Sequence, residues 1–253
     1  MLSLLALSTL GAIWAWCNHA QSAGTQHLNN SALGTFSLTK PGKATKAQVI
    51  LALPAEQLLS DTQLLSLSQG SGARIVQYSI AVSDCDQQQH RLHAAQQQLD
   101  GPATLVAGIG PGAALAWRWL ATQDDEQHQA ISVGFSLEHP DCPAPLPPKS
   151  EHGQWLAAWN NNPDDPSARF VRGQPHNTQN LISDYDTSLQ QLLYDQLSRR
   201  LQGLRDPLPV IELPASSHND TVTLFYSGDG GWRDLDMEVA EDMAKHGYPV
   251  VGI

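Results

Sequence analysis

The chain has 253 residues, a formal net charge of −11 at pH 7, and 41% hydrophobic against 15% charged residues. This composition is that of a globular protein and excludes disordered and collagen-like chains, while the length admits one large domain or one domain with part of another. Lysine and arginine together number 14, so a nucleic-acid partner is not expected, because phosphate contacts require clustered cations.

Residues 1–23 are predicted to be a signal peptide or an uncleaved anchor. The segment has an apolar run of roughly 16 residues followed by small and polar ones, which is shorter than a full membrane span of about 20. A positively charged start, usual in signal peptides, is missing. Both alternatives imply export, with the chain either released or held at the membrane, and a mis-assigned start is the remaining alternative.

Two cysteines, Cys85 and Cys142, remain after a cleavage near residue 23. An even number of cysteines in an oxidising compartment is consistent with one disulfide. A pair of free thiols is the alternative that the sequence leaves open.

Residues 24–46 are polar and show no periodicity, so they are predicted to be a linker. Residues 47–205 then alternate strand and helix patterns around a proline-rich loop at 140–148. Strands are expected at 47–53, 74–82, 103–109, 130–137, 154–160 and 168–173, and helices at 55–67, 87–99, 113–121 and 182–204. This alternation predicts an α/β fold with a mostly parallel sheet and flanking helices.

Residues 206–220 contain three prolines and a polar end, and they are predicted to be a second linker. The pattern then restarts with a strand at 221–228, a helix at 235–245 and a strand at 248–253. One helix and two strands bury too little apolar surface to fold alone. Residues 221–253 are therefore predicted to be the truncated start of a second domain.

The segment SGDGGWRD carries glycines between a predicted strand and a predicted helix. Backbone N–H groups of Gly230, Gly231 and Trp232 would lie near the helix N-terminus, where anions are stabilised. In an α/β-hydrolase this position supplies half of the oxyanion hole. An ordinary glycine-rich turn is the alternative.

A second glycine pattern, VAGIGPGAALAW, has the strand, turn and helix of a nucleophile elbow, with Gly110 where a serine would stand between Gly108 and Gly112. This predicts a hydrolase fold that lacks its nucleophile. The alternative is a tight turn suited to a phosphate group. A dinucleotide-binding fingerprint fits less well, because the glycines are spaced two apart throughout.

Asp164 or Asp165, followed by His176, matches the chain order of a hydrolase triad. The chain has ten histidines and many acidic residues, so chance matches are easy and solvated loop residues are the favoured interpretation. Cysteine and histidine spacings of zinc sites are missing, as are the P-loop and EF-hand motifs. No metal or cofactor is expected.

The final segment, TVTLFYSGDGGWRDLDMEVAEDMAKHGYPVVGI, resembles the opening of the domain shared by the bacterial virulence proteins VirJ and AcvB. The matching residues of the loop are Gly228, Asp229, Gly230, Gly231 and Trp232. The layout is similar to AcvB-like proteins, which implies that residues 47–205 are their less specific N-terminal half. The resemblance also implies a periplasmic location and an α/β-hydrolase fold for both parts.

The resemblance further implies hydrolysis of the aminoacyl ester of aminoacyl-phosphatidylglycerol, with a modified phospholipid headgroup as partner. In the family pattern the G-x-S-x-G serine, the acid and the histidine would lie beyond Ile253, so the chain alone is expected not to hydrolyse esters, although the full-length protein should.

Two other functions remain open. VirJ relatives are also associated with type IV secretion, which implies a non-catalytic protein that contacts secretion-system proteins and assists substrate transfer. The other is a binding domain that holds a headgroup phosphate at Gly108 to Gly112.

Overall fold

The structure is a computed structural model that describes residues 22–30, 32–80, 84–175, 178–204, 211–215, 220–227, 232 and 234–252. The chain forms two compact units, residues 1–205 and residues 206–253. Residues 1–21, most of the predicted leader, lie outside the described part. Each unit is described by itself below.

The first unit is built on one eight-stranded sheet with the order β1-β2-β4-β3-β5-β6-β7-β8. The strands are β1 (Gly24–Asn30), β2 (Gly34–Lys40), β3 (Ala47–Leu53), β4 (Ala73–Ser79), β5 (Leu105–Ile109), β6 (Gln129–Val133), β7 (Gln154–Trp159) and β8 (Thr178–Ile182). The six strands from β4 to β8 in this order are parallel, whereas β1 and β2 pair antiparallel and β2 is antiparallel to β4. The predicted mostly parallel sheet is confirmed.

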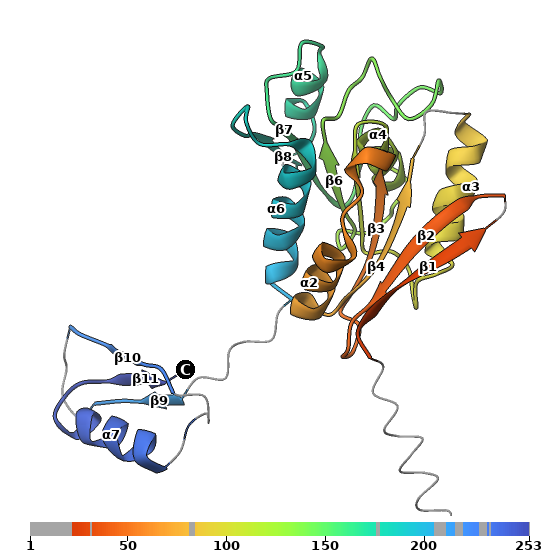
Figure 1. Ribbon diagram of the computed structural model, residues 1–253. Coiled ribbons are helices and arrows are strands. Elements are labelled where there is room, and N and C mark those ends of the chain that lie inside the picture. The colour runs from red at the N-terminus through yellow and green to blue at the C-terminus, as the bar shows by residue number, and fades with distance from the viewer. Residues whose placement is uncertain are drawn as a thin grey trace, which may run out of the picture. The chain divides into compact units, whose positions relative to one another are not determined.

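Helices cover both faces of this sheet (Figure 1). They are the 3₁₀ helix η1 (Ala55–Gln57) and the α-helices α2 (Asp61–Ser71), α3 (Cys85–Gln96), α4 (Pro111–Leu120), α5 (Ser167–Arg172) and α6 (Leu189–Gln202). One apolar cluster contains buried side chains of α3, α4 and α5, and the other contains those of α2 and α6. No helix within the described residues is long and apolar enough to cross a membrane.

The predicted linker at 24–46 is wrong for the segments 24–30 and 34–40, which form the hairpin of β1 and β2. β1 lies at the sheet edge and is largely exposed, so it carries polar residues that hide its strand pattern. In β2 only Phe36 and Leu38 are large, apolar and buried, and they alternate as a half-buried strand requires.

The predicted strand at 168–173 is wrong, because these residues form α5. Ala168 and Val171 are both buried, and their spacing of three is helical. The predicted helix at 182–204 begins too early. Its start falls at the end of β8, and α6 begins only after Ser188, whose hydroxyl caps the helix by accepting a hydrogen bond from the Gln191 N–H.

An aromatic cluster holds α4 against the sheet. The ring centroids of Trp117 on α4 and Trp155 on β7 lie 4.0 Å apart. The Trp155 indole donates a 2.9 Å hydrogen bond to Ser132 Oγ, which in turn donates to the Ala113 carbonyl at 2.8 Å. The buried indole N–H and hydroxyl are therefore satisfied, and they tie β6 and β7 to the first turn of α4.

The proline-rich loop after β6 is attached to α3 and α4. A disulfide joins Cys85, the first residue of α3, to Cys142, with the Cα atoms 5.2 Å apart. Arg118 on α4 donates from Nε to Asp141 Oδ1 at 2.7 Å and from Nη1 to the Pro145 carbonyl at 2.7 Å. Covalent and ionic contacts thus place this loop over the helix layer.

The second unit contains a three-stranded sheet in the order β10-β11-β9 and one helix. Its elements are β9 (Ile211–Leu213), β10 (Thr223–Phe225), α7 (Asp234–Lys245) and β11 (Val250–Gly252). β10 and β11 are parallel, and β9 pairs antiparallel with β11. The predicted linker at 206–220 is therefore wrong at 211–213, because Pro209 and Pro214 flank the short strand instead of interrupting it.

We expect the double substitution Cys85→Ser with Cys142→Ser to lower the free energy of unfolding by about 2 to 4 kcal/mol, because the bridge closes a loop with a sequence separation of 57. Urea denaturation without reductant, followed by tryptophan fluorescence, measures the loss. As a control, dithiothreitol should destabilise the native protein but not the double variant. A loss below about 0.5 kcal/mol would show that the bridge does not constrain the unfolded chain.

Candidate functional site

The turn between β5 and α4 has the backbone of a nucleophile elbow. β5 ends at Ile109, Gly110 has φ +56° and ψ −114°, and α4 begins at Pro111. The Gly110 N–H donates a 2.9 Å hydrogen bond to the Val133 carbonyl at the end of β6. This positive φ is a strained conformation for a residue with a side chain, and such a turn exposes a nucleophile at the carboxyl edge of an α/β-hydrolase sheet.

Gly108 and Gly112 let the strand and the helix pack closely around this turn. A Cβ atom at Gly108 would lie 2.1 Å from the backbone of Gly112. A Cβ atom at Gly112 would lie 1.9 Å from the carbonyl oxygen of Ala52 on β3. Both glycines are therefore required by packing, and their presence does not by itself indicate a ligand.

Gly110 differs from its two neighbours, because a Cβ atom there would meet nothing within 4 Å. The nucleophile position thus has room for a side chain but carries none. The following residue is Pro111, which has no N–H, whereas a hydrolase uses the N–H after its nucleophile as an oxyanion donor. Sequence reasoning missed this second loss, although Pro111 is plain in the sequence. The elbow lacks two of the groups that acyl transfer needs.

Asp165, one of the two predicted catalytic acids, accepts hydrogen bonds that stabilise its own loop. Asp165 Oδ2 accepts from Ser136 Oγ at 2.6 Å, and Asp165 Oδ1 accepts from the Ser167 N–H at 2.9 Å. Desolvation would raise the pKa of Asp165, but the hydrogen bonds from Ser136 and Ser167 outweigh it and hold this pKa below its ordinary value. Asp164, beside it, is exposed.

His176 lies outside the described residues, so its role in a triad stays a prediction. A hydrolase triad places its acid before its histidine in the chain. The six residues between β8 and α6, numbered 183–188, are Ser, Asp, Tyr, Asp, Thr and Ser and include no histidine. The described part of the first unit therefore does not bring a histidine next to the elbow from this connection.

Within the predicted oxyanion loop of the second unit, Trp232 is described, whereas Gly228, Asp229, Gly230 and Gly231 lie outside the described residues. The Trp232 ring lies 5.3 Å from the Phe225 ring, centroid to centroid. A Cβ atom at Gly252 would lie 1.7 Å from the Trp232 ring. Trp232 thus packs on β10 and β11, and an anion site in this loop remains a prediction.

Among the described residues, no group of three or more His, Cys, Asp or Glu side chains is placed to hold a metal ion.

Comparison with known proteins gives a family match for one segment and several similar solved structures. Residues 220–253 match the family model of the bacterial virulence protein VirJ, which confirms the resemblance of this segment. No sequence match was found among curated proteins.

Among solved structures, the chain is similar to an alpha-beta serine hydrolase homologue from Coxiella burnetii, with 16% identity, a TM-score of 0.48, and coverage of 70% of this chain and 96% of the other. It is also similar to the esterase domain of a Rhodothermus marinus protein, with 11% identity, a TM-score of 0.49, and coverage of 72% and 96%. A third is a lidless serine hydrolase from Xanthomonas campestris, with 17% identity, a TM-score of 0.46, and coverage of 72% and 93%. The fold class that the structure itself shows is α/β, with a mostly parallel sheet and flanking helices.

We expect Gly110→Ala to lower the free energy of unfolding by about 1 to 2 kcal/mol, the cost of a side chain at positive φ without a clash. Gly108→Ala and Gly112→Ala should each lower the free energy of unfolding by at least about 3 kcal/mol, because a Cβ atom at either position would overlap backbone atoms. Urea unfolding of the three variants measures the difference. Equal losses at all three positions would contradict the elbow geometry.

We expect Ser136→Ala to raise the pKa of Asp165 toward its ordinary value, because the carboxylate loses a hydrogen bond. A lowered pKa stabilises the folded state above the unfolded pKa of about 3.9, and this contribution is lost as the pH falls through the folded pKa. Carboxyl ¹³C NMR titration measures the shift. Ser150→Ala is the control, since Ser150 Oγ donates only to the carbonyls of Leu120 and His152. An unchanged Asp165 titration in Ser136→Ala would reject the assignment.

Proposed function

We propose that this chain is the N-terminal portion of a periplasmic VirJ/AcvB-like virulence-associated protein. Its full-length form is a serine hydrolase that cleaves the aminoacyl ester of aminoacyl-phosphatidylglycerol. The match of residues 220–253 to the VirJ family model carries the proposal. The aminoacyl lipid and the periplasmic location come from the family resemblance.

Ester cleavage requires a nucleophilic hydroxyl, a base that takes its proton, and donors that stabilise the oxyanion of the tetrahedral intermediate. At the elbow of the first unit Gly110 has no hydroxyl and Pro111 has no N–H to donate. These losses support assigning the chemistry to the VirJ-type domain. The first unit then serves substrate access, membrane positioning or stability.

Type IV secretion offers a second, non-catalytic function, and one surface of the second unit favours it. Val222, Leu224 and Tyr226 alternate along β10 and its flanks, so they share one face of the strand, and each is more than half exposed. An exposed apolar row of this kind suits contact with another protein. In this alternative the chain assists substrate transfer and cleaves nothing.

The experiment compares two proteins on vesicles that contain lysyl- or alanyl-phosphatidylglycerol, with released amino acid measured by mass spectrometry. The 253-residue chain should release none, because without nucleophile and base only a small residual acceleration survives. A gene product that includes the complete VirJ-type domain should release the amino acid, and changing its G-x-S-x-G serine to alanine should abolish release.

Gly110→Ala in the longer protein is the matched control, and it should keep activity within about twofold, because the first elbow takes no part in the reaction. Release by the 253-residue chain that disappears on His176→Ala would instead make the first unit the catalyst. Inactivity of the longer protein, together with secretion defects on changing Leu224 to Asp, would favour the interaction function.

A further inference from the structure

A cleft of about 260 Å³ lies at the amino edge of the parallel strands, the edge opposite the elbow. The first residues of β3, β5 and β6 and the last turn of α6 contribute to its lining. The lining residues are Lys46, Ala47, Thr104, Leu105, Gln127, Gln129, Arg200, Leu201 and Leu204. Among the described residues, this lining contains two cations, neutral polar side chains and apolar ones, but no carboxylate.

Arg200 is the central feature of this cleft. It lies in the last turn of α6, it is partly buried, and its Nη1 donates to the neutral Gln154 Oε1 at 3.0 Å. Within the described part of the chain, no carboxylate lies within ion-pair distance of its guanidinium. Burial lowers the pKa of Arg200, which reflects a cation removed from water without a compensating anion.

Two other arginines of the first unit have carboxylate partners, unlike Arg91, which donates to the Leu33 carbonyl. Arg74 pairs with Asp100, and Arg118 pairs with Asp141, in both cases at 2.7 Å. The protein carries a net charge of −11, so carboxylates are plentiful. Buried charges in proteins are ordinarily paired, and Arg200 departs from the treatment that Arg74 and Arg118 receive.

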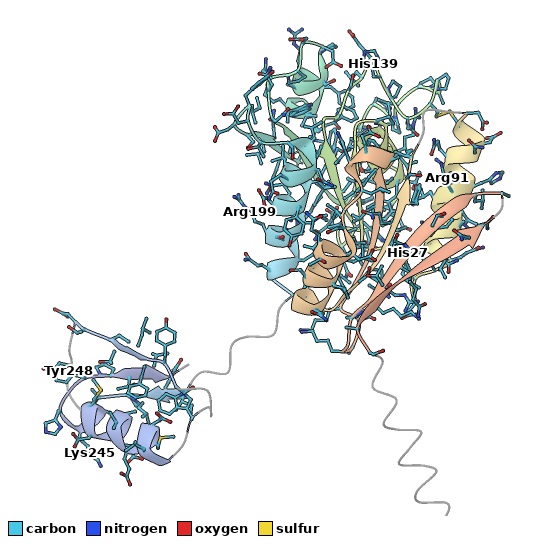
Figure 2. All side chains as sticks on the ribbon, in the orientation of Figure 1. His27, Arg91, His139, Arg199, Lys245 and Tyr248 are labelled. Carbon is cyan, nitrogen blue, oxygen red and sulfur yellow. A yellow bond between two sulfur atoms is a disulfide. The ribbon has the colours of Figure 1, made fainter. Side chains whose placement is uncertain are left out.

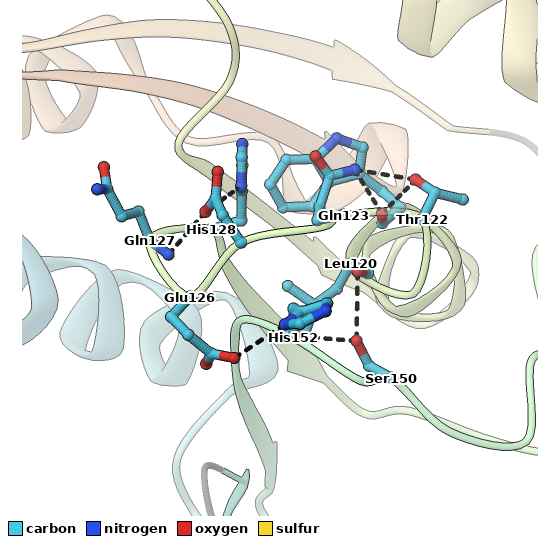
Figure 3. A network of polar contacts seen from close by, with 10 residues as sticks. Leu120, Thr122, Gln123, Glu126, Gln127, His128, Ser150 and His152 are labelled. Atoms are coloured by element: carbon cyan, nitrogen blue, oxygen red, sulfur yellow. Dashed lines mark hydrogen bonds and ion pairs between the residues drawn. The ribbon is translucent and has the colours of Figure 1, made fainter.

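Two described acids that precede Gln127 in the chain are engaged elsewhere. Asp125 Oδ1 lies 2.8 Å from His128 Nδ1, and Glu126 Oε1 lies 3.1 Å from His152 Nδ1. Figure 3 shows the side chains of Glu126 and His152 directed toward each other. Neither acid lines the cleft, so neither serves as the counterion of Arg200.

We propose that the cleft at Arg200 and Lys46 binds a phosphate group, either as free phosphate or as the phosphodiester of a lipid headgroup. An oxyanion beside Arg200 would supply the missing counter-charge, since guanidinium groups bind phosphate oxygens through two parallel N–H donors. Lys46 Nζ already donates to the Leu204 carbonyl at 2.9 Å, and it brings a second positive charge to the same cleft.

The lining also limits the ligand. The amides of Gln127 and Gln129 can donate to phosphate oxygens, while the volume of about 260 Å³ is at the small end of ligand sites. A phosphate or a glycerophosphate group suits this space better than a nucleotide does. The inference goes beyond the function proposed above and does not depend on ester cleavage.

A structural role is the competing explanation, because cations in the last turn of a helix interact favourably with its negative end. Arg199 provides the matched comparison. It is the neighbouring residue on the same turn of α6, it is exposed, and Figure 2 shows its side chain extending away from the body of the first unit. Both arginines lie near the negative end of the helix dipole, but only Arg200 lines the cleft.

Isothermal titration of the 253-residue protein with inorganic phosphate and with glycerophosphoglycerol, at constant ionic strength, tests the proposal. Arg200→Gln should weaken binding about tenfold or more, and Arg200→Lys should restore part of it, because one charge-assisted contact is lost or kept. Arg199→Gln should change the affinity less than about twofold, because general helix-end and charge effects are small. If Arg200→Gln fails to fold, Lys46→Gln tests the same cleft by a change at an exposed position.

Flotation with phosphatidylglycerol vesicles and phosphatidylcholine vesicles separates the two sources of phosphate. Binding of the small anions that requires Arg200 supports a site for free phosphate. Retention on phosphatidylglycerol vesicles that Arg200→Gln abolishes supports a headgroup site. The proposal is overturned if no probe binds, or if Arg199→Gln and Arg200→Gln weaken binding equally. None of these measurements involves hydrolysis, so their failure is distinct from failure of the proposed function.

Discussion

The close approach of α4 to the centre of the sheet is the constraint on which the first unit depends. Gly112 lies against the Ala52 carbonyl and Gly108 lies against Gly112, with no room for a Cβ atom at either position. Since α4 is buried along most of its length, its position sets where β6 and β7 meet it, through Ser132 and Trp155. The sharp turn at Gly110 follows from this packing, because the chain must reverse direction within a few residues.

This packing fixes the backbone of the turn at Gly110, but it does not supply the chemical groups that a hydrolase needs there. The backbone at Gly110 has the conformation that presents a nucleophile, and the space beside it is open, yet the hydroxyl and the following N–H are both missing. Packing explains why the turn persists without them, because the glycines support the helix and strand whatever residue stands between them. The backbone shape of such a turn can therefore persist without a nucleophilic side chain at its centre.

The charged side chains of the first unit also divide into those that stabilise the fold and one that we propose binds a ligand. Asp165, which the chain order suggested as a catalytic acid, organises the loop after β6 and the start of α5 through Ser136 and Ser167. Asp141 holds Arg118 and with it the loop that carries Cys142. Among the described residues Arg200 has no carboxylate partner and donates to Gln154, and the proposed phosphate group would supply its counter-charge. The second unit adds the segment that matches the VirJ family model.

The sequence alone determined the α/β class, the positions of the buried parallel strands and most helices, the glycine turn at Gly110 and the family of residues 220–253, because these depend on local periodicity and short motifs. Only the tertiary structure decided that 24–40 pairs as an edge hairpin, that 168–171 is helical, and that β8 precedes α6, since their polar or short patterns are ambiguous without neighbours. The roles of Asp165 and Arg200 likewise depend on partners distant in the chain. Contacts between residues such as Gly112 and Ala52 leave no local signal, because the energy comes from packing across the sheet.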